Sequence, residues 1–331
     1  MSKKPLFIFS VLVIGMLVFT ACAPAAAPAP VEEPAMEEAP VEAAPVEEAK
    51  GPDWWEGLGT EENPIIFVAV PSGETERVLS GFDKMAKMIY ANTGLVIEPF
   101  VATSYVSAIE AFCQDPPKAH MGALATFAYI LASSKGCAQT ALVSVRNGAA
   151  FYNGQFVVRA DSGLEKLEDL KGLTWCAPSL TSTSGYVIPS IMFKAVGIDA
   201  TTDFAGILEG GGAHEVGLTA LYNGQCDFAT SYIDARSRIE GEFPDVMEKT
   251  TVIEVMPDIP NDGIQFVTDM PVALKGKLVK AILDLFKTEE GKAAMEEAYQ
   301  WTAMETHGDD FYDQFRQVLD AAGIDPEELA K

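Results

Sequence analysis

The sequence predicts an α/β fold of two lobes with a ligand cleft between them, the second lobe inserted in the first. β-rich runs alternate with amphipathic helical segments, which is typical of a largely parallel sheet. A cluster of hydroxyl side chains at 179–185, SLTSTSG, stands directly before an apolar helical segment, and no internal repeat suggests a solenoid. We expect residues 53–157 and 256–331 to form the first lobe, and residues 158–255 to form the second.

The first 22 residues resemble a lipoprotein signal peptide. MSKK supplies positive charge, and the apolar run at 6–19 is shorter than the about 20 residues of a membrane-spanning helix but suits a secretory signal. Small residues precede Cys22 in FTAC, so we expect cleavage there and lipidation of Cys22. Ordinary signal cleavage beside a stray cysteine is the alternative.

Residues 23–52 consist mostly of Ala, Pro, Glu and Val, with the loose repeat VEEPA, MEEAP, VEAAP, VEEAK. A segment without aromatic residues has little to bury and is expected to stay extended and disordered. We therefore predict that it is a tether lifting a folded domain off a membrane.

The first lobe is expected to begin with a β-rich run at 63–70, NPIIFVAV. An amphipathic helix follows, because Val78, Phe82, Met85 and Ile89 recur at the spacing of one helix face. The other elements expected here are strands at 95–102, 141–147 and 263–268 and helices at 107–113, 127–133, 272–287, 291–299 and 311–322.

The second lobe repeats the scheme of strand, loop and helix. A strand is expected at 154–163, a short helix and a strand within 167–179, a helix from about His214, and strands at 226–231 and 251–255. The glycine-rich stretch GILEGGGAHEVG between them lacks the spacing of a nucleotide-binding loop, so we interpret it as a connection at the cleft rim.

The formal net charge of the chain is −25, and most of it falls after residue 52. Nucleic acid is therefore not expected as a partner, because phosphate backbones require a basic surface. An acidic protein that binds an anion must do so through local dipoles and hydroxyl groups.

Four cysteines remain after Cys22, namely Cys113, Cys137, Cys176 and Cys226. An even set outside the cytosol is typical of disulfides, and four cysteines allow three pairings. We favour Cys113–Cys137 and Cys176–Cys226, since each pair then lies within one lobe; four buried free thiols are the alternative. No cysteine and histidine spacing indicates zinc.

The hydroxyl cluster is the strongest candidate for a binding site. Ser182, Thr183, Ser184 and Gly185 stand at the start of a helix, where unpaired N–H groups and the positive end of the helix dipole favour an oxyanion. The alternative is that these residues only cap the helix.

Longer motifs resemble the periplasmic phosphate, phosphite and phosphonate-binding proteins of ABC importers. The first is DSGLEKLEDLKGLTWCAPSLTSTSGYVIPSIMFKAVGID at 161–199. VPSGETERVL, FVATSYVSAIEA, GGAHEVGLTALYNGQCDFATS, MPDIPNDGI and FRQVLDAAGID also match that family in order. The resemblance runs from about Ile65 to the C-terminus.

The resemblance implies the two-lobed, type II-like fold of periplasmic binding proteins and a set of ligand contacts. Ser182–Gly185 would hold the phosphonate oxygens, with Tyr105 reaching into the cleft from the first lobe and His214 contacting the anion. Asp234 matches an acid for a substrate amine and Asp262 a second cleft acid. That pair suggests a monoprotonated or amine-bearing ligand.

One segment departs from the pattern of the family, and Tyr152 is a weaker candidate for the site. The segment at 120–127, HMGALATF, lacks the family's cleft-facing aromatic residue, so we expect a roomier or rebuilt wall there. Tyr152 is expected in the core or at the lobe boundary rather than at the ligand.

The resulting prediction is a lipid-anchored solute-binding protein outside the cytoplasmic membrane. It would carry a phosphonate, phosphite or phosphate to an ABC permease and its ATPase, as a monomer without cofactor or metal. One alternative is another small solute, such as a sulfonate, an amino acid or a thiamine precursor. The other is a secreted serine hydrolase using Ser184, His214 and Asp234, although no GxSxG, SxxK or HExxH motif is present.

Overall fold

The computed structural model describes residues 53–326. The predicted signal peptide, the tether and Cys22 lie outside the described residues. Its helices are α1 Thr75–Thr93, α2 Tyr105–Cys113, α3 Thr126–Ser134, α4 Ile188–Ala195, α5 His214–Tyr222, α6 Val246–Lys249, α7 Val272–Leu285, α8 Glu289–Tyr299 and α9 Asp313–Ala322. None of the helices in this part of the chain is long and apolar enough to cross a membrane.

The strands form two main sheets and one short pair, so the predicted α/β class is confirmed. The strands are β1 Ile65–Ala69, β2 Ile97–Val101, β3 Met121–Ala123, β4 Ala138–Val145, β5 Phe151–Tyr152, β6 Gly154–Arg159, β7 Thr174–Ala177, β8 Gly206–Glu209, β9 Phe228–Tyr232, β10 Thr250–Val255, β11 Ile259–Pro260, β12 Gly263–Val267 and β13 Ala303–Thr306.

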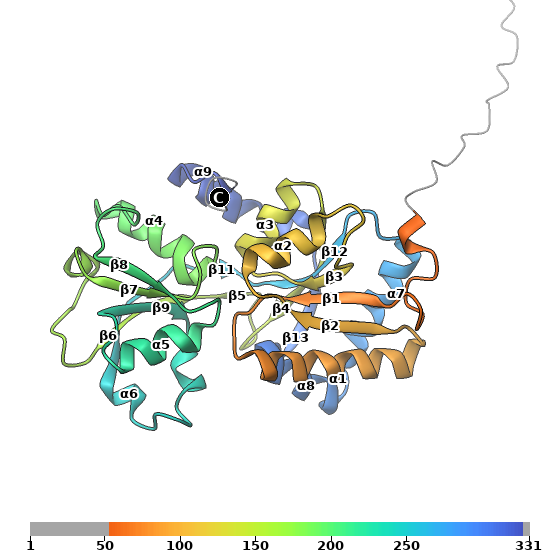
Figure 1. Cartoon of the computed structure of the whole chain (residues 1–331), viewed down its shortest axis with the longest axis horizontal. Helices are drawn as coiled ribbons and strands as arrows, with labels where there is room; N and C mark the ends of the chain where they lie inside the picture. Colours follow the sequence, from red (N-terminus) through yellow and green to blue (C-terminus); the bar gives the residue numbers. More distant parts are fainter. Residues whose placement is uncertain (1–52, 327–331) are drawn as a thin grey trace, which may run out of the picture. The chain divides into compact units, whose positions relative to one another are not determined.

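The first sheet has six strands in the order β13-β4-β12-β3-β1-β2. β1 pairs in parallel with β2 and β3, whereas β12 runs antiparallel to β3 and β4. Helices α1 and α8 lie on one face of this sheet and α2 and α3 on the other (Figure 1). The sheet and these helices, with α7, form what we call the first lobe.

Helix α1 shows how the sequence builds this lobe. The Glu74 carboxylate accepts hydrogen bonds from the N–H groups of Glu76 and Arg77 and caps the helix start, and Gly94, at φ 72°, ends it. Between these caps, the predicted face is buried against the sheet: Val78, Phe82, Met85 and Ile89. The amphipathic pattern was therefore sufficient to orient this helix.

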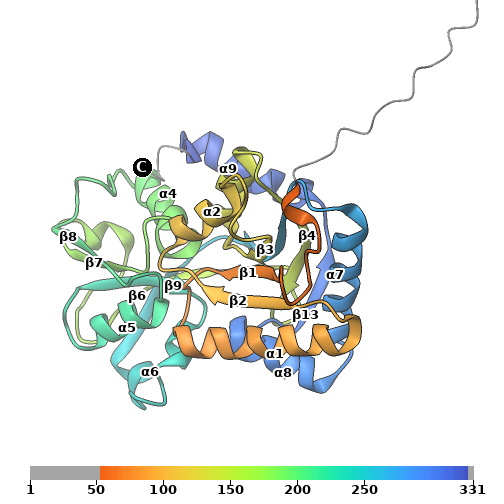
Figure 2. The same ribbon diagram turned by 45° about the vertical axis from the view of Figure 1, so that its right-hand side comes forward.

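The second sheet has five strands in the order β10-β6-β9-β7-β8 and, with α4, α5 and α6, forms the second lobe (Figure 2). β7, β8 and β9 are parallel, and β6 runs antiparallel to β9 and β10. Trp175 on β7 is fully buried, and its indole N–H donates to Oγ1 of Thr230 over 2.8 Å. Phe193 and Phe228 pack against its ring, so this lobe has its own aromatic core.

The chain passes from one sheet to the other beside the antiparallel pair of β5 and β11, in which Tyr152 faces Ile259. The expected lobe boundary at 157/158 cuts through β6, yet every residue of β6 from Gly154 to Val158 pairs with β9 of the second sheet. The first crossing therefore lies earlier, at β5. The second crossing follows β10, next to the expected boundary at 255/256.

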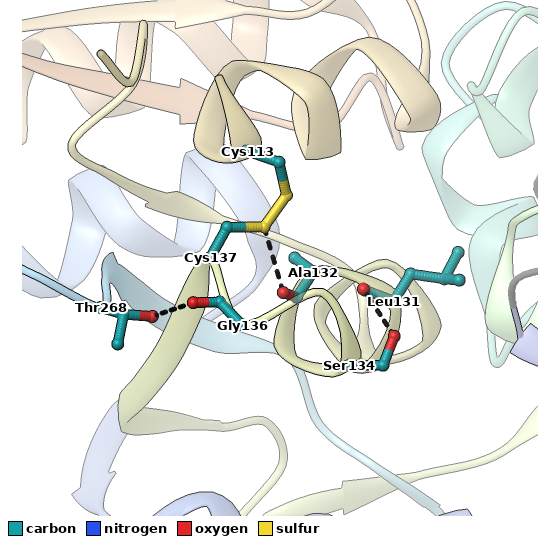
Figure 3. The surroundings of a disulfide bond; sticks show 7 residues. All are labelled: Cys113, Leu131, Ala132, Ser134, Gly136, Cys137 and Thr268. Carbon is teal, nitrogen blue, oxygen red and sulfur yellow. Dashed lines mark hydrogen bonds between the residues drawn. A yellow bond between two sulfur atoms is a disulfide. The ribbon is translucent and has the colours of Figure 1, made fainter. Parts of the chain in front are cut away.

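Disulfide bonds join Cys113 to Cys137 and Cys176 to Cys226, which is the pairing favoured by the sequence. Cys113 ends α2, and Cys137 directly precedes β4, so the first bond ties the end of a helix to the start of a strand (Figure 3). The second bond joins Cys176 in β7 to Cys226, which lies just before β9. Each bond lies within one lobe.

Candidate functional site

A cavity of about 50 Å³ is lined by residues at the starts of five helices. Gly73 directly precedes the α1 cap, Tyr105 begins α2 and Ala125 caps α3. From the second lobe, Ser182 caps the π-helical turn Thr183–Val187 that leads into α4, and His214 begins α5. Because helix starts present unpaired N–H groups and positive dipole ends, their convergence favours an anion.

This convergence follows from the topology. β1, β2, β3, β7 and β8 are parallel strands, and each is followed by a helix that starts just beyond the carboxyl end of its strand. In open α/β sheets, ligands bind at that edge. The cavity is the place where the two such edges, one from each lobe, face each other.

The predicted hydroxyl cluster lines this cavity, with one correction. Ser182, Thr183 and Ser184 are all buried to 2% exposure or less and are part of the wall. Gly185 is not part of the wall, and its N–H donates to Oγ of Ser182 over 3.2 Å inside the turn. A Cβ at 185 would lie 2.2 Å from the ring of Pro178, so glycine is needed there for packing rather than for the ligand.

Tyrosine hydroxyls add neutral donors. Burial raises the pKa of Tyr105 well above its usual value, and burial raises that of Tyr152 and of Tyr232 to about 12. All three side chains line the cavity and keep their protons near pH 7. Tyr152 lies on the crossing strand β5, at the lobe boundary as expected, but it also belongs to the cavity wall.

His214 also lines the cavity, as the resemblance implied. Burial, with a contribution from the Arg146 charge, lowers its pKa to about 3, so the imidazole is neutral near pH 7. Nε2 lies 3.5 Å from Oγ of Ser182, and the buried Nδ1 has no hydrogen-bond partner. A neutral imidazole can donate one hydrogen bond to an anion from either nitrogen, depending on its tautomer.

The two predicted acids are not brought together. Asp262 lines the cavity, but its carboxylate already accepts two bonds of 2.8 Å from Nη2 of Arg146, one from Ser144 and one from the Trp301 indole. Asp234 lies outside this wall but lines an adjoining cavity of about 420 Å³, which shares Arg146, Tyr152, Tyr232 and Gln300 with the first. The two acids therefore line neighbouring cavities, and their role toward an amine stays a prediction.

Asp234 has a structural role at its own position. Its carboxylate accepts hydrogen bonds from Nε and Nη2 of Arg236, at 3.0 and 2.9 Å, and from Gln155. The side chain also caps the short 3-10 helix Ala235–Arg238 by accepting from the N–H of Arg236. This local pairing compensates the charge of Asp234 at the adjoining cavity.

The same positions argue against a hydrolase triad. His214 Nε2 faces Ser182 rather than Ser184, and His214 Nδ1 has no acceptor, whereas a triad requires a carboxylate there. Asp234, which would be the acid of such a triad, forms an ion pair with Arg236 instead.

Three arginines line the cavity although the sequence did not single them out: Arg77, Arg146 and Arg238. Arg77 forms an ion pair of 2.8 Å with Glu215 of the second lobe and also donates to the carbonyls of Glu297 and Ala298. Arg146 directly follows β4. Its position at the end of an expected strand is the one sequence feature that could have identified it as a site residue.

The segment at 120–127 provides little of the wall. Of its residues, Ala125 is the one that lines the cavity, and His120 instead stacks on Trp54 and accepts the N–H of Ile66. Tyr299, at the end of α8, lies in the wall and donates its hydroxyl to the carbonyl of Val70. The first-lobe side of the wall is therefore formed mainly by elements other than this segment.

Comparisons with known proteins identify the family of this chain. A family model described as ABC transporter, phosphonate, periplasmic substrate-binding protein matches residues 67–312. The phosphate-import protein PhnD of Mycolicibacterium smegmatis is 26% identical over 174 residues, which are 49% of this chain and 53% of that protein. The chain thus matches about half the length of this curated relative.

Two solved structures share the fold. A binding protein component of a phosphonate ABC transporter from Pseudomonas aeruginosa superposes with a TM-score of 0.72 at 25% identity, covering 78% of this chain and 87% of that one. PhnD1 from Prochlorococcus marinus, in complex with methylphosphonate, gives 0.69 at 14% identity, covering 78% and 98%. The second likeness concerns the fold alone.

The matched family consists of transport binding proteins rather than enzymes. Its model covers most of the chain and includes both lobes, the hydroxyl cluster and the cavity. This chain therefore belongs to the periplasmic substrate-binding proteins of phosphonate ABC transporters.

Proposed function

We propose that this chain captures a small phosphorus oxyanion outside the cytoplasmic membrane and delivers it to an ABC permease, whose ATPase supplies the energy. The observation that carries the proposal is the convergence of five helix starts on one cavity that also holds buried hydroxyl donors. Such a wall offers many donors to a compact, multiply oxygenated anion.

The oxygens of the ligand would accept from Ser182, Thr183 and Ser184 on one side of the cavity. Tyr105 and Tyr152 would donate from the first lobe and the crossing strand, and His214 from the second lobe. These groups are buried and neutral, so they bind an anion without requiring a proton from solvent.

Lobe closure would complete the site. Two contacts join the lobes beside the cavity: the N–H of Phe127 donates to Oγ1 of Thr183, and Arg77 pairs with Glu215. A ligand that touches both lobes favours the closed form over the open one, and the closed form is what a permease would recognise. We further propose that Cys22 carries the lipid anchor that keeps the protein at the membrane.

The test is calorimetric titration of the purified protein with phosphate, phosphite, methylphosphonate, 2-aminoethylphosphonate and sulfate. We expect at least one phosphorus ligand to bind and sulfate to bind more weakly. Ser182→Ala combined with Ser184→Ala should reduce the affinity at least tenfold. Ser190→Ala on α4, whose hydroxyl donates to the carbonyl of Tyr186 outside the cavity wall, is the matched control.

Absence of binding to every phosphorus ligand by correctly folded protein would contradict the proposal. Preference for sulfate over all of them would assign the site to sulfur oxyanions instead.

A further inference from the structure

The guanidinium groups of the cavity wall are not equivalent. Arg146 is paired with Asp262 and Arg77 with Glu215, each over 2.8 Å. Arg238, the third, forms none of the ion pairs found among residues 53–326. One positive charge of the wall is therefore not compensated by a neighbouring carboxylate.

Arg238 also has an unused donor. It ends the 3-10 helix Ala235–Arg238 after β9, its side chain is half-buried, and its buried Nε has no hydrogen-bond partner. A buried, charged N–H without an acceptor is costly and rare in folded proteins. A bound anion in the cavity that Arg238 lines would supply the acceptor.

The one carboxylate of this wall does not compensate Arg238. Within residues 53–326, Asp262 is the one acid that lines the cavity, and Arg146, Ser144 and Trp301 already donate to it. An anionic ligand in the cavity would therefore be the partner of the Arg238 charge.

The size of the cavity suits a phosphorus oxyanion. Its volume is about 50 Å³, and on the same measure one water needs about 10–15 Å³. A phosphorus atom with its oxygens fills such a space. A cavity of about 420 Å³ adjoins it, shares Arg146, Tyr152, Tyr232 and Gln300 with it, and has room for a substituent on the phosphorus.

We infer that Arg238 is a specificity-determining residue that binds the second negative charge of the ligand, so that the site selects a doubly ionised phosphorus oxyanion over its singly ionised form. This inference rests on the proposed function and names the ligand class of the same site. The protein would thus discriminate between the dianion and the monoanion of the same phosphonate.

The test measures the dissociation constant of methylphosphonate below and above its second pKa. The protein's own groups change little between those conditions, because the pKa of His214 is about 3 and the pKa values of Tyr152 and Tyr232 are about 12. The remaining charges at the wall are Arg77 with Glu215 and Arg146 with Asp262. We expect tighter binding above the second pKa of the ligand.

Variants at 238 identify the responsible group. Arg238→Gln should weaken binding of the dianion by about 10- to 100-fold, the loss expected for a hydrogen bond to a charged group, and should flatten the pH dependence. Arg238→Lys should retain the pH dependence while binding less tightly, because it keeps the charge but not the planar fork. Lys135→Gln, which removes the same charge from an exposed position, should change neither.

Two results would overturn the inference while leaving the proposed function intact: equal affinity of the native protein for methylphosphonate below and above its second pKa, or Arg238→Gln keeping the native affinity and pH dependence. Failure of the native protein to bind any phosphorus ligand is a different outcome and would overturn both. Retained folding of Arg238→Gln is checked by its thermal transition.

Discussion

The backbone N–H of Phe127, in the first lobe, donates a 2.9 Å hydrogen bond to Oγ1 of Thr183, in the second lobe. Thr183 is also part of the cavity wall, so one hydroxyl both faces the ligand site and joins the lobes. A hydroxyl accepts with its lone pairs and retains its own proton. The Thr183 side chain therefore contributes both to the ligand site and to the contact between the lobes.

Thr183→Val should weaken ligand binding by about 1–3 kcal/mol, because closure then leaves the buried N–H of Phe127 without an acceptor. Thr183→Ser restores the hydroxyl and is expected to bind nearly as the native protein does. Calorimetric titration measures both. Equal affinity of the valine and serine variants would show that this bond does not contribute to closure.

The ion pair of Arg77 and Glu215 makes a second connection, from α1 to α5. Its side chains are 23% and 13% exposed, so solvent screens the pair only partly. We expect Glu215→Gln to accelerate ligand release and to weaken binding, since Arg77 then keeps its carbonyl partners but loses its charge partner across the lobes.

A double-mutant cycle with Arg77→Gln isolates this contribution, and a coupling of about 0.5–3 kcal/mol is expected for residues in direct contact. Ligand dissociation measured by stopped flow gives the four rates. Additive effects of the two changes would mean that the pair does not hold the lobes together. Arg77 also lines the cavity, so its single variant alone is not diagnostic.

Much of the fold was predictable because its signals are local. The buried face of α1, with Phe82 and Met85, follows from the 3.6-residue period, and much of the strand and helix order follows from alternating patterns. The short strands β3, β8 and β13 were not expected, and β8 lies in the stretch interpreted as a connection. The expected lobe boundary at 157/158 falls inside β6, because β6 is one continuous β-rich run. Nothing in its residues marks where the crossing ends and the second sheet begins.

The site was predictable only in part, for a physical reason. Ser182 and His214 stand in motifs that can be read along the chain, whereas Arg146 and Arg238 become important only when two sheet edges face each other. The carboxylate of Asp234 is paired with Arg236, two residues later, and a motif does not reveal such a local pairing. Which charged side chains form ion pairs with one another depends on the folded structure.

The buried His214 predicts a pH dependence of stability. Its pKa of about 3 lies below the ordinary 6.5, so between these values the unfolded chain binds a proton that the folded protein does not. The free energy of unfolding should therefore fall as pH decreases from about 6.5 toward 3, by up to about 1.4 kcal/mol per pH unit from this residue.

His214→Asn should remove that part of the slope in denaturant unfolding measured across this pH range. His120, whose pKa burial lowers to about 4, contributes in the same direction and stays in both proteins, so it cancels in the comparison. An unchanged slope in the variant would show that His214 is protonated as readily in the folded protein as in the unfolded chain.

Asp262→Asn separates charge balance from ligand contact. The carboxylate accepts from Arg146, Ser144 and Trp301, so an amide in its place loses an ion pair that is largely buried. We expect the free energy of unfolding to fall by about 3 kcal/mol, the lower range for breaking a buried pair. Denaturant unfolding measures this loss.

The same change should raise the affinity for a phosphorus oxyanion, because Arg146 is released from its carboxylate at the cavity wall. If Asp262 instead held a ligand proton or ammonium group, the affinity would fall, and it would fall most for an amine-bearing ligand. Calorimetric titration of methylphosphonate and 2-aminoethylphosphonate distinguishes the two roles. Reduced affinity for both ligands, in a variant that remains folded, would assign Asp262 to ligand recognition rather than to neutralising Arg146.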